Sequence, residues 1–383
     1  MERHTRTPEL VVDLDLVAAA YRAITSGLPG LTVYYAMKCN PHPAVLTRLR
    51  DLGCNFEIAS APELDALLGV GVDPARVMYS NPVKPVDHIA RAYAAGVRHF
   101  AADSPDELVK LCDAAPGSAV LVRLAADRLR SDVPSEGKFG VDVDTAAILL
   151  LAARDRGLDP HGIAFHVGSQ MLSPHAWRAP LSAVGQVMDK LVAENLFLRT
   201  VDLGGGFPAR YSAQVPPLSE YASVIDAGLA NLPYPVRAII EPGRAMVAEA
   251  GMLRATVIGT AVRAGKRWAH LDIGAFNGLM ESLETGNRLR FPVSDSRRSP
   301  LRDLFHLTGP TCDSQDTIMF DVELSADLST GDEVYIGSTG SYTTVYASAF
   351  NGFDPPSVRC ASGTSARVTD EAGIDRRNWW CVY

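Results

Sequence analysis

The sequence predicts an α/β fold in which a (β/α)8 barrel is followed by a second, mostly β domain. Three observations predict this fold. The chain has 383 residues, short apolar runs alternate with helical patterns over its first two thirds, and strands with turns prevail from Met252 onward. The length exceeds that of one ordinary domain and suits two domains, or one large barrel with an appendage.

Eight short runs in the first two thirds are apolar on both faces, as strands buried in a parallel sheet should be. They are Leu31–Met37, Asn55–Ala59, Val77–Ser80, Val97–Ala101, Ala119–Leu124, Gly162–Val167, Arg199–Leu203 and Arg237–Ile240. Eight strand–helix units over roughly 220 residues match the size of a β/α barrel. An open doubly wound sheet is the competing interpretation, because the period of the pattern does not separate the two.

Helix signals fill most of the gaps between these runs. Asn40-Pro41 offers a cap followed by proline, and Ser60–Glu63 and Ser104–Glu107 have the form of capping boxes. Asp144–Arg156 is a strong helical pattern closed by a glycine, and Ala176–Glu194 is another long one. We therefore expect helices after most of the barrel strands.

Beyond the barrel, five segments have the pattern of strands with turns between them: Leu253–Val262, Arg267–Asp272, Thr317–Leu324, Asp332–Ile336 and Ser357–Arg359. The expected division is an N-terminal segment (1–20) that joins the β-domain, the barrel (21–250), the β-domain (251–363) and a C-terminal tail (364–383).

The composition excludes several classes of protein. Hydrophobic residues make up 47% and charged residues 21%, which supports a large core and excludes global disorder. The net charge of −8 leaves no basic excess for holding nucleic acid or an anionic membrane. None of the six cysteines forms a Cys-x-x-Cys pair or a zinc-spaced cluster, so no metal and a reduced, cytoplasmic setting are expected.

The residues in or just after the carboxyl-terminal parts of the predicted strands carry the chemistry, because the carboxyl ends of barrel strands meet at one rim. In chain order these residues are Lys38, Glu57, Ser60, Asn81, Asp103, Arg123, His166, Gly168-Ser169, Gly204–Gly206 and Glu241–Arg244. Only six of the 36 basic residues are lysines, so a lysine-dependent chemistry has few candidates. Each feature also has a structural explanation: Lys38 as a loop residue, His166 as a core histidine, Glu241 and Arg244 as a local ion pair.

Pyridoxal phosphate chemistry requires this combination. The aldehyde needs a lysine amine, and the phosphate needs backbone N–H groups, a hydroxyl and arginine. The flat ring is suited to a stacked neighbour such as His166. A carboxylate such as Glu241 beside the pyridine nitrogen favours the protonated ring, which then accepts electrons from a carbanion left by departing CO2.

These residues resemble a known family, the group IV (fold type III) pyridoxal-phosphate amino-acid decarboxylases that act on ornithine, lysine and diaminopimelate. The resemblance covers roughly Thr7 to Phe353. It rests on Tyr35-Ala36-Met37-Lys38-Cys39-Asn40, Phe165-His166-Val167-Gly168-Ser169, Gly204-Gly205-Gly206-Phe207-Pro208, Glu241-Pro242-Gly243-Arg244, Gly309-Pro310-Thr311-Cys312-Asp313 and Phe350-Asn351-Gly352-Phe353. The family's fold, which is alanine-racemase-like, is a barrel followed by a β-domain.

The resemblance implies a role for each matching residue. Lys38 matches the Schiff-base lysine, His166 the residue stacked on the ring, and Glu241 the partner of the pyridine nitrogen. Arg123 and Glu57 match supporting positions, although the family more often has aspartate in place of Glu57. The implied contacts to the cofactor phosphate and its surroundings are Ser169, Gly204, Gly205, Gly206, Gly243, Arg244 and Tyr342.

The resemblance also implies a homodimer with shared active sites. Cys312 and Asp313 match residues lent to the neighbour's site, where Cys312 would protonate the α-carbon and Asp313 would hold the distal ammonium of the substrate. Phe350 matches a substrate-binding position, and Glu281 is expected to be a second acid that reads the distal amine. The segment Phe276–Leu283 is similar to the specificity segment of bacterial ornithine/lysine decarboxylases.

The expected activity is therefore decarboxylation of L-ornithine to putrescine, with L-lysine as a further substrate, because one methylene changes binding by only about 1–3 kcal/mol. Four alternatives stay open. They are a decarboxylase of diaminopimelate or of a specialised amino acid, a racemase on the same barrel, a non-catalytic homologue that binds a regulatory partner, and a sugar-phosphate enzyme. Glu241 argues against the racemase, where arginine is typical, Lys38 and Cys312 argue against the non-catalytic homologue, and the Cys312-Asp313 motif argues against the sugar-phosphate enzyme.

Overall fold

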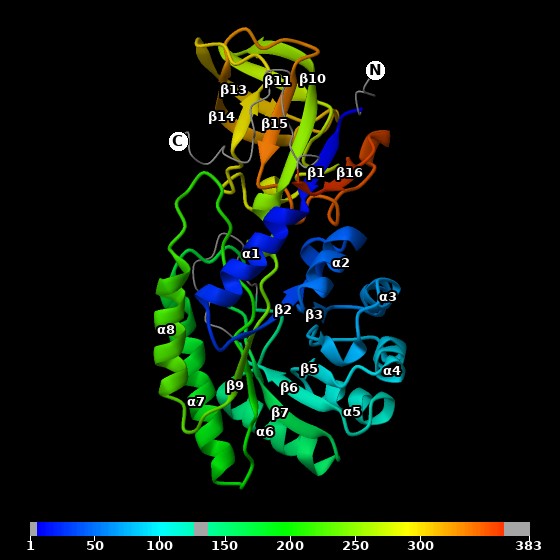
Figure 1. Ribbon diagram of the computed structural model, residues 1–383, viewed down its shortest axis with the longest axis vertical. Coiled ribbons are helices and arrows are strands. Elements are labelled where there is room, and N and C mark those ends of the chain that lie inside the picture. Colours follow the sequence, from blue (N-terminus) through cyan, green and yellow to red (C-terminus); the bar gives the residue numbers. More distant parts are fainter. Residues whose placement is uncertain (1–5, 126–136, 364–383) are drawn as a thin grey trace. The chain divides into compact units, whose positions relative to one another are not determined.

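The computed structural model describes residues 6–125 and 137–363 and divides the chain into two compact units (Figure 1). One unit comprises Tyr21–Pro208 and Val215–Gly243. Among the described residues, the other comprises 6–20, the short segment Ala209–Gln214, and 244–363. We expected the barrel to end at residue 250, and the division lies between Gly243 and Arg244. The predicted tail at 364–383 lies outside the described residues.

The first unit is built on a closed barrel of eight parallel strands, so the predicted barrel is confirmed and the open sheet is excluded. Each strand pairs in parallel with the next, and the first pairs with the last, Thr32 opposite Ile239 and Val33 opposite Ile240. The strands are β2 (Thr32–Ala36), β3 (Asn55–Ile58), β4 (Val77–Tyr79), β5 (His99–Ala102), β6 (Ala119–Arg123), β7 (Asp159–Ala164), β8 (Thr200–Asp202) and β9 (Arg237–Ile240).

Helices follow most of these strands. They are α2 (Pro43–Asp51), α3 (Ala61–Gly69), α4 (Val86–Ala95), α5 (Pro105–Ala114), α6 (Val143–Asp155), α7 (Arg178–Val192) and α8 (Leu218–Ala230), with short 3-10 turns η1 (Met37–Cys39), η2 (Pro74–Arg76) and η3 (Pro174–Trp177). The hydroxyls of Ser60 and Ser104 accept from the N–H groups of Glu63 and Glu107, both at 3.3 Å, which confirms the two predicted helix starts.

The inside of the barrel is filled by side chains from five strands: Tyr34, Met78, Leu121, Ala164 and Ile239, all buried. A packed interior of this kind holds the strands in fixed register, so it also fixes the positions of the residues that follow them. The residues at the carboxyl ends of the strands therefore stand on a rigid support.

The second unit is a mostly β domain, as predicted. Its eight-stranded sheet runs β12-β15-β10-β11-β13-β14, with β1 paired to β10 and β16. The strands are β1 (Glu9–Asp13), β10 (Gly251–Arg263), β11 (Lys266–Leu271), β12 (Val293–Asp295), β13 (Arg302–Thr308), β14 (Thr317–Ser325), β15 (Glu333–Gly337) and β16 (Ser357–Ala361). The short helices are α9 (Arg244–Val247), η4 (Ala248–Ala250), α10 (Glu281–Glu284) and η5 (Phe350–Gly352); α1 (Leu14–Gly27) follows β1.

The N-terminal strand β1 lies between two strands from the other end of the chain. Glu9 stands opposite Arg254 in antiparallel β10 and opposite Ser357 in parallel β16. Its carboxylate forms ion pairs with Arg254 at 2.8 Å and Arg359 at 3.1 Å. Leu10, Val11 and Val12 are fully buried, so this strand belongs to the core of the β unit.

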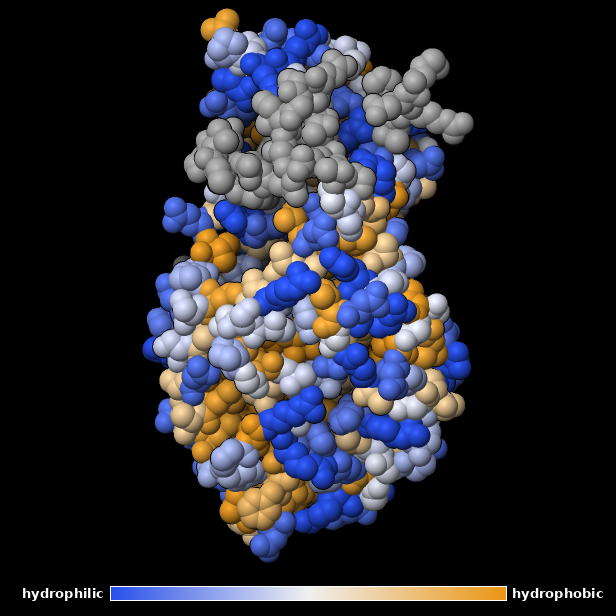
Figure 2. Space-filling model, in the orientation of Figure 1, coloured by the Kyte–Doolittle hydropathy of each residue, from blue (hydrophilic) through white to orange (hydrophobic). Residues whose placement is uncertain are grey.

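The surface of the barrel unit in Figure 2 carries hydrophilic side chains interspersed with hydrophobic ones. Across the described ranges, no helix combines the length and the apolarity that crossing a membrane would require.

Candidate active site

The barrel collects most of the predicted site residues at one rim, because each lies at or just beyond the carboxyl end of a strand. Lys38 is in η1 after β2, and Glu57 is within β3. Arg123 ends β6, and His166 and Ser169 lie in the loop after β7. The glycines 204–206 follow β8, and Glu241 and Gly243 follow β9.

Lys38 and Glu57 form an ion pair at this rim. The Nζ atom lies 3.5 Å from Oε2 of Glu57, and the lysine side chain is 50% exposed whereas the carboxylate is 2% exposed. Burial and, to a smaller extent, the nearby Glu241 raise the pKa of Glu57 to about 7, and Lys38 opposes this rise. Lys38 thus places an accessible amine beside Glu57, a buried acid that gains and loses a proton near neutral pH.

This shift makes the stability of the chain depend on pH. Between the ordinary pKa of 4.5 and the folded pKa of about 7, the folded chain holds a proton at Glu57 that the unfolded chain releases. The stabilisation is therefore complete below 4.5 and is lost as the pH rises through 7, by about 3 kcal/mol. Between pH 4.5 and a pH above 7, we expect the free energy of unfolding of wild type to fall by about 3 kcal/mol more than that of Glu57→Gln, because glutamine does not titrate.

Urea denaturation at pH values on either side of this window measures the effect. Glu220→Gln serves as the matched control, because Glu220 is an exposed glutamate of α8 in the same unit, and this variant should follow wild type. Parallel stability profiles for wild type and Glu57→Gln would contradict the assigned protonation of Glu57.

His166 presents a neutral ring to the same rim. Burial, together with the positive charges of Arg123 and Lys38, lowers the pKa of His166 to about 3. The backbone N–H of Gly205 donates to Nδ1 at 3.3 Å, so that nitrogen accepts and Nε2 carries the ring proton. Arg123 in turn lies 5.3 Å from the ring of Phe139, measured from the guanidinium carbon to the ring centre.

The turn after β8 requires glycine, because its positions leave no room for a Cβ atom. A Cβ on Gly204 would lie 2.2 Å from the carbonyl oxygen of Phe165, and Gly204 and Gly206 have φ of +67° and +99°. At Gly205 a Cβ would lie 2.6 Å from the carbonyl oxygen of Glu241. The turn therefore packs directly against the loops after β7 and β9, with its backbone close to His166 and Glu241.

Glu241 is the centre of a group of acids inside this rim. Its backbone N–H donates to Gly204 at 2.9 Å, and its Oε1 accepts a short hydrogen bond from the hydroxyl of Ser80. Asp202, 1% exposed, also forms a side-chain hydrogen bond with Glu241. Burial and the Glu241 charge raise the pKa of Asp202 well above its ordinary value. Sequence reasoning missed Ser80 and Asp202 as site residues, although both belong to predicted strands.

Gly243 lies where the loop after β9 packs closely against the end of β2 and η1. A Cβ there would lie 3.0 Å from the sulfur of Cys39 and 3.2 Å from the carbonyl oxygen of Ala36, and the N–H of Ala36 donates to Pro242 at 3.2 Å. The loop after β9 is thereby held against the segment that carries Lys38.

In the β unit, Arg244 is buried among three other site residues. Its Nη1 donates to Oε2 of Glu281 at 2.9 Å and to the hydroxyl of Tyr211 at 2.7 Å, and its Nη2 donates to Oε1 of Glu281. The ring of Tyr342 lies 4.8 Å from the guanidinium carbon. Both oxygens of Glu281 therefore contact Arg244, and its expected role on a substrate amine stays a prediction.

Cys312 and Asp313 are exposed on the loop between β13 and β14. Asp313 accepts from the N–H of Gln315 at 2.8 Å, and Asn351 donates to the sulfur of Cys312 at 3.3 Å. The loop is held from inside by Asp316, which is fully buried and accepts from Thr311, through its N–H and its hydroxyl, and from the N–H of Ala275, at 2.7–3.0 Å. Asp316 was not predicted from the sequence.

Phe350, in η5, lies beside the segment that was expected to set specificity. Its ring centre is 4.9 Å from that of Phe276, and the N–H of Ser348 donates to the carbonyl of Phe276 at 2.8 Å. Asn277, 1% exposed, fastens this segment to the loop near η5 through Asp354 at 3.1 Å. The β unit thus brings Cys312, Phe350 and Phe276 into one neighbourhood.

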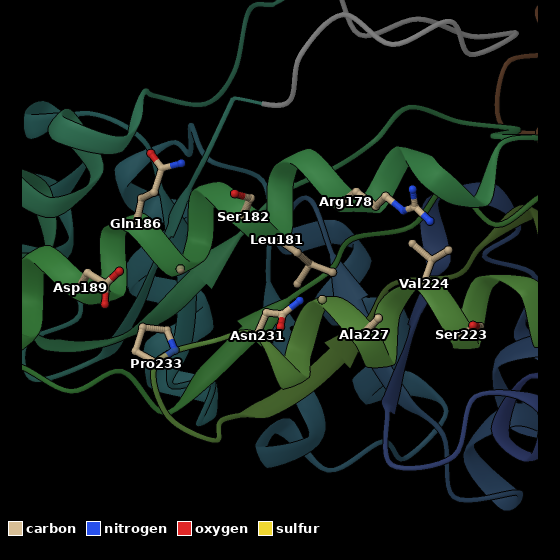
Figure 3. A pocket seen from close by; sticks show the side chains of 12 residues that line it. Arg178, Leu181, Ser182, Gln186, Asp189, Ser223, Val224, Ala227, Asn231 and Pro233 are labelled. Carbon is tan, nitrogen blue, oxygen red and sulfur yellow. The ribbon is translucent and has the colours of Figure 1, made fainter.

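A groove lies on the outside of the barrel unit between α7 and α8 (Figure 3). No predicted site residue lines it. Its walls come from Arg178, Leu181, Ser182, Gly185, Gln186, Asp189, Ser223, Val224, Ala227, Gly228, Asn231 and Pro233. Within the parts of the chain that the structure covers, no group of three or more His, Cys, Asp or Glu side chains could hold a metal ion.

Comparison with known proteins identifies related sequences. Residues 14–248 match the family described as pyridoxal-dependent decarboxylase, pyridoxal binding domain. A curated relative named lysine/ornithine decarboxylase, from Selenomonas ruminantium, is 38% identical over 352 residues, which cover 91% of this chain and 88% of the relative.

Solved structures are similar along the same length. A lysine/ornithine decarboxylase from Vibrio vulnificus, complexed with cadaverine, has a TM-score of 0.85 and 32% identity, covering 93% of this chain and 94% of that one. The arginine decarboxylase of Paramecium bursaria Chlorella virus has a TM-score of 0.87 and 27% identity, covering 94% of this chain and 96% of that one.

Proposed function

We propose that this chain, which belongs to the pyridoxal-dependent decarboxylase family, removes the α-carboxyl group of a basic L-amino acid, L-ornithine first and L-lysine as well. The observation that carries the proposal is the barrel rim, where an accessible lysine amine, a neutral imidazole and an ionisable acid beside a glycine turn follow successive strands. The relatives named above act on, or are complexed with, basic amino acids and their amines.

The residues at the rim fit pyridoxal phosphate. When bound, this group supplies an aldehyde for imine formation and an electron-accepting ring. The amine of Lys38 is exposed enough to reach such an aldehyde, and its pairing with Glu57 keeps it at a fixed place on the rim. Glu57 also provides a proton-accepting group beside that amine, because its pKa is about 7.

The remaining barrel residues orient the group. The neutral ring of His166 offers a flat face without a competing positive charge, and Glu241 offers a carboxylate for the protonated pyridine nitrogen. The glycine turn and Ser169 are assigned to the anionic phosphate on the strength of the family motif, while the N–H groups of Gly204 and Gly205 donate to Asp202 at 2.9 Å and to His166 at 3.3 Å. On the strength of the family motif, Gly243 of the barrel unit and Arg244 and Tyr342 of the β unit are each assigned to cofactor binding; within the β unit, Glu281 orients Arg244 through two hydrogen bonds.

We further propose that the enzyme is a homodimer whose partner chain completes each active site. The exposure of Cys312, Asp313 and Phe350 supports this, because such side chains are accessible to a second copy. Asp313 would bind the distal ammonium of the substrate, and the thiol of Cys312 would deliver the proton that replaces the lost carboxyl group. We also propose a cytoplasmic location, as expected from the cysteine pattern of the sequence.

Release of labelled CO2 from L-ornithine, L-lysine, L-arginine and diaminopimelate, measured side by side on the purified holoenzyme, tests the substrate class. We expect kcat/KM for ornithine and lysine to differ by roughly 10–200-fold at most, because the two differ by one methylene. Diaminopimelate should react far more slowly, because its second carboxylate would face Asp313. Highest activity on diaminopimelate, or none on any of the four, would contradict the proposal.

A further inference from the structure

Ser80 lies inside the barrel rim, where its hydroxyl donates a hydrogen bond to the carboxylate of Glu241. Ser80 directly follows β4, and Glu241 directly follows β9, so the two are 161 positions apart in the chain. The hydroxyl donates to Oε1 of Glu241 in a short hydrogen bond. A hydroxyl that donates to a carboxylate stabilises the ionised form and restricts its rotation.

Ser80 is held in place by its own backbone and by the loop that follows it. Its N–H donates to the carbonyl of Ile58 in β3 at 3.1 Å. The next loop is fixed by Lys84, a fully buried lysine whose Nζ donates to the carbonyls of Asn81 at 3.0 Å and Ala101 at 2.5 Å. The Ser80 hydroxyl is thus aimed by a rigid frame.

The charge of Lys84 is itself compensated inside the protein. Its Nζ lies 2.8 Å from Oε1 of Glu107, whose other oxygen lies 2.5 Å from Nζ of Lys110. Loss of this partner would leave a buried, unpaired charge on Lys84 and lower the stability of the fold, so the network makes the loop difficult to displace. The frame behind Ser80 is therefore built from several mutually dependent contacts.

The surroundings of Glu241 explain why a neutral donor is needed there. Asp202 and Glu57 are buried acids close enough to affect each other and Glu241 electrostatically. Burial and the charge of Glu241 raise the pKa of Asp202 well above its ordinary value, so these acids repel one another when they are charged. Ser80 donates a hydrogen bond to Oε1 without adding charge, and a carboxylate oxygen keeps a second lone pair for another donor.

We propose that Ser80 is a positioning residue that holds the Glu241 carboxylate in the orientation in which it meets the pyridine nitrogen of the cofactor. The inference rests on the proposed function, and it goes beyond it by assigning a residue outside the family motifs. Ser80 does not touch the reacting atoms; it acts through Glu241.

Four variants test this assignment: Ser80→Ala, Ser80→Thr, Glu241→Ala and the double variant Ser80→Ala with Glu241→Ala. Removing one charge-assisted hydrogen bond should lower kcat and weaken retention of pyridoxal phosphate by about tenfold each. KM should change by less than about twofold, because the substrate is not contacted. Ser80→Thr keeps the hydroxyl and should stay within about threefold of wild type in both measurements.

Cofactor retention, measured by dialysis of the holoenzymes and absorbance of the released pyridoxal phosphate, gives a readout independent of turnover. In the Glu241→Ala background, Ser80→Ala should change retention by less than about twofold, because its acceptor is gone. An equal loss in both backgrounds, or wild-type values for Ser80→Ala, would overturn the role of Ser80 while leaving the enzyme a decarboxylase. A wild-type protein that retained no pyridoxal phosphate would overturn this inference and the proposed function together.

Discussion

Replacing Lys38 with alanine should lower decarboxylation of ornithine and lysine by at least about a thousandfold, because the variant loses the amine that carries the cofactor. The visible absorption band of the bound cofactor should shift toward that of the free aldehyde. The fold should persist, because the Lys38 side chain is half exposed and contributes little to the core. Rates of CO2 release and the absorption spectrum measure both effects.

Lys190→Ala is the matched control for this variant. Lys190 is a lysine of α7 in the same unit with a similarly exposed side chain, 49% against 50%, and it also forms one ion pair, with Asp144 at 2.9 Å. It should retain wild-type turnover. Near-normal activity in Lys38→Ala, or an equal loss in both variants, would show that Lys38 is not the lysine that carries the cofactor.

Replacing Cys312 with alanine should slow turnover by about a hundredfold, the usual effect of losing one positioned general acid. The product should change as well. A proton delivered at the α-carbon gives the diamine, whereas a proton delivered to the cofactor instead gives an amino-aldehyde after hydrolysis. We expect the aldehyde fraction to rise in Cys312→Ala, measured by chromatography of the products. An unchanged product ratio at an unchanged rate would show that Cys312 is not the proton donor.

Mixing two inactive variants tests whether Cys312 acts in the partner's site. If Lys38 comes from one chain and Cys312 from the other, random exchange of Lys38→Ala and Cys312→Ala makes mixed dimers in half of the molecules. Each mixed dimer then holds one intact site, so about one quarter of wild-type activity should return. Activity that stays at the level of the separate variants would place both residues in the same chain.

Much of the fold is predictable because the barrel strands are short, apolar on both faces and regularly spaced. Each of the eight predicted runs overlaps one observed strand. Three strands of the β unit were not predicted as strands: β1, which lies in the expected N-terminal segment, and β12 and β13, which have weak patterns. β12 is only three residues long, and β13 begins with three residues, Arg302–Leu304, that are not buried, which hides its apolar half. Such strands are defined by their pairing partners rather than by their own sequence.

The candidate site is predictable where a residue belongs to a local motif at the end of a strand, as Lys38, His166 and the glycine turn do. It is not predictable where the essential contact joins distant parts of the chain. Asp316 organises the Cys312 loop through Ala275, 41 positions away. The contacts of Glu281 to Arg244, 37 positions away, are of the same kind, and its expected role on a substrate amine stays a prediction. Ser80 is a similar case, because a serine after a strand carries no sign of its acceptor.

Borohydride reduction of the native holoenzyme, followed by peptide mapping, tests the central claim most directly. Reduction would fix pyridoxal phosphate on the amine that holds it, and mass spectrometry would identify the modified lysine. We expect the label on the peptide containing Lys38, in about one equivalent per chain. A label on any other lysine, or a protein that gains no label, would contradict this expectation.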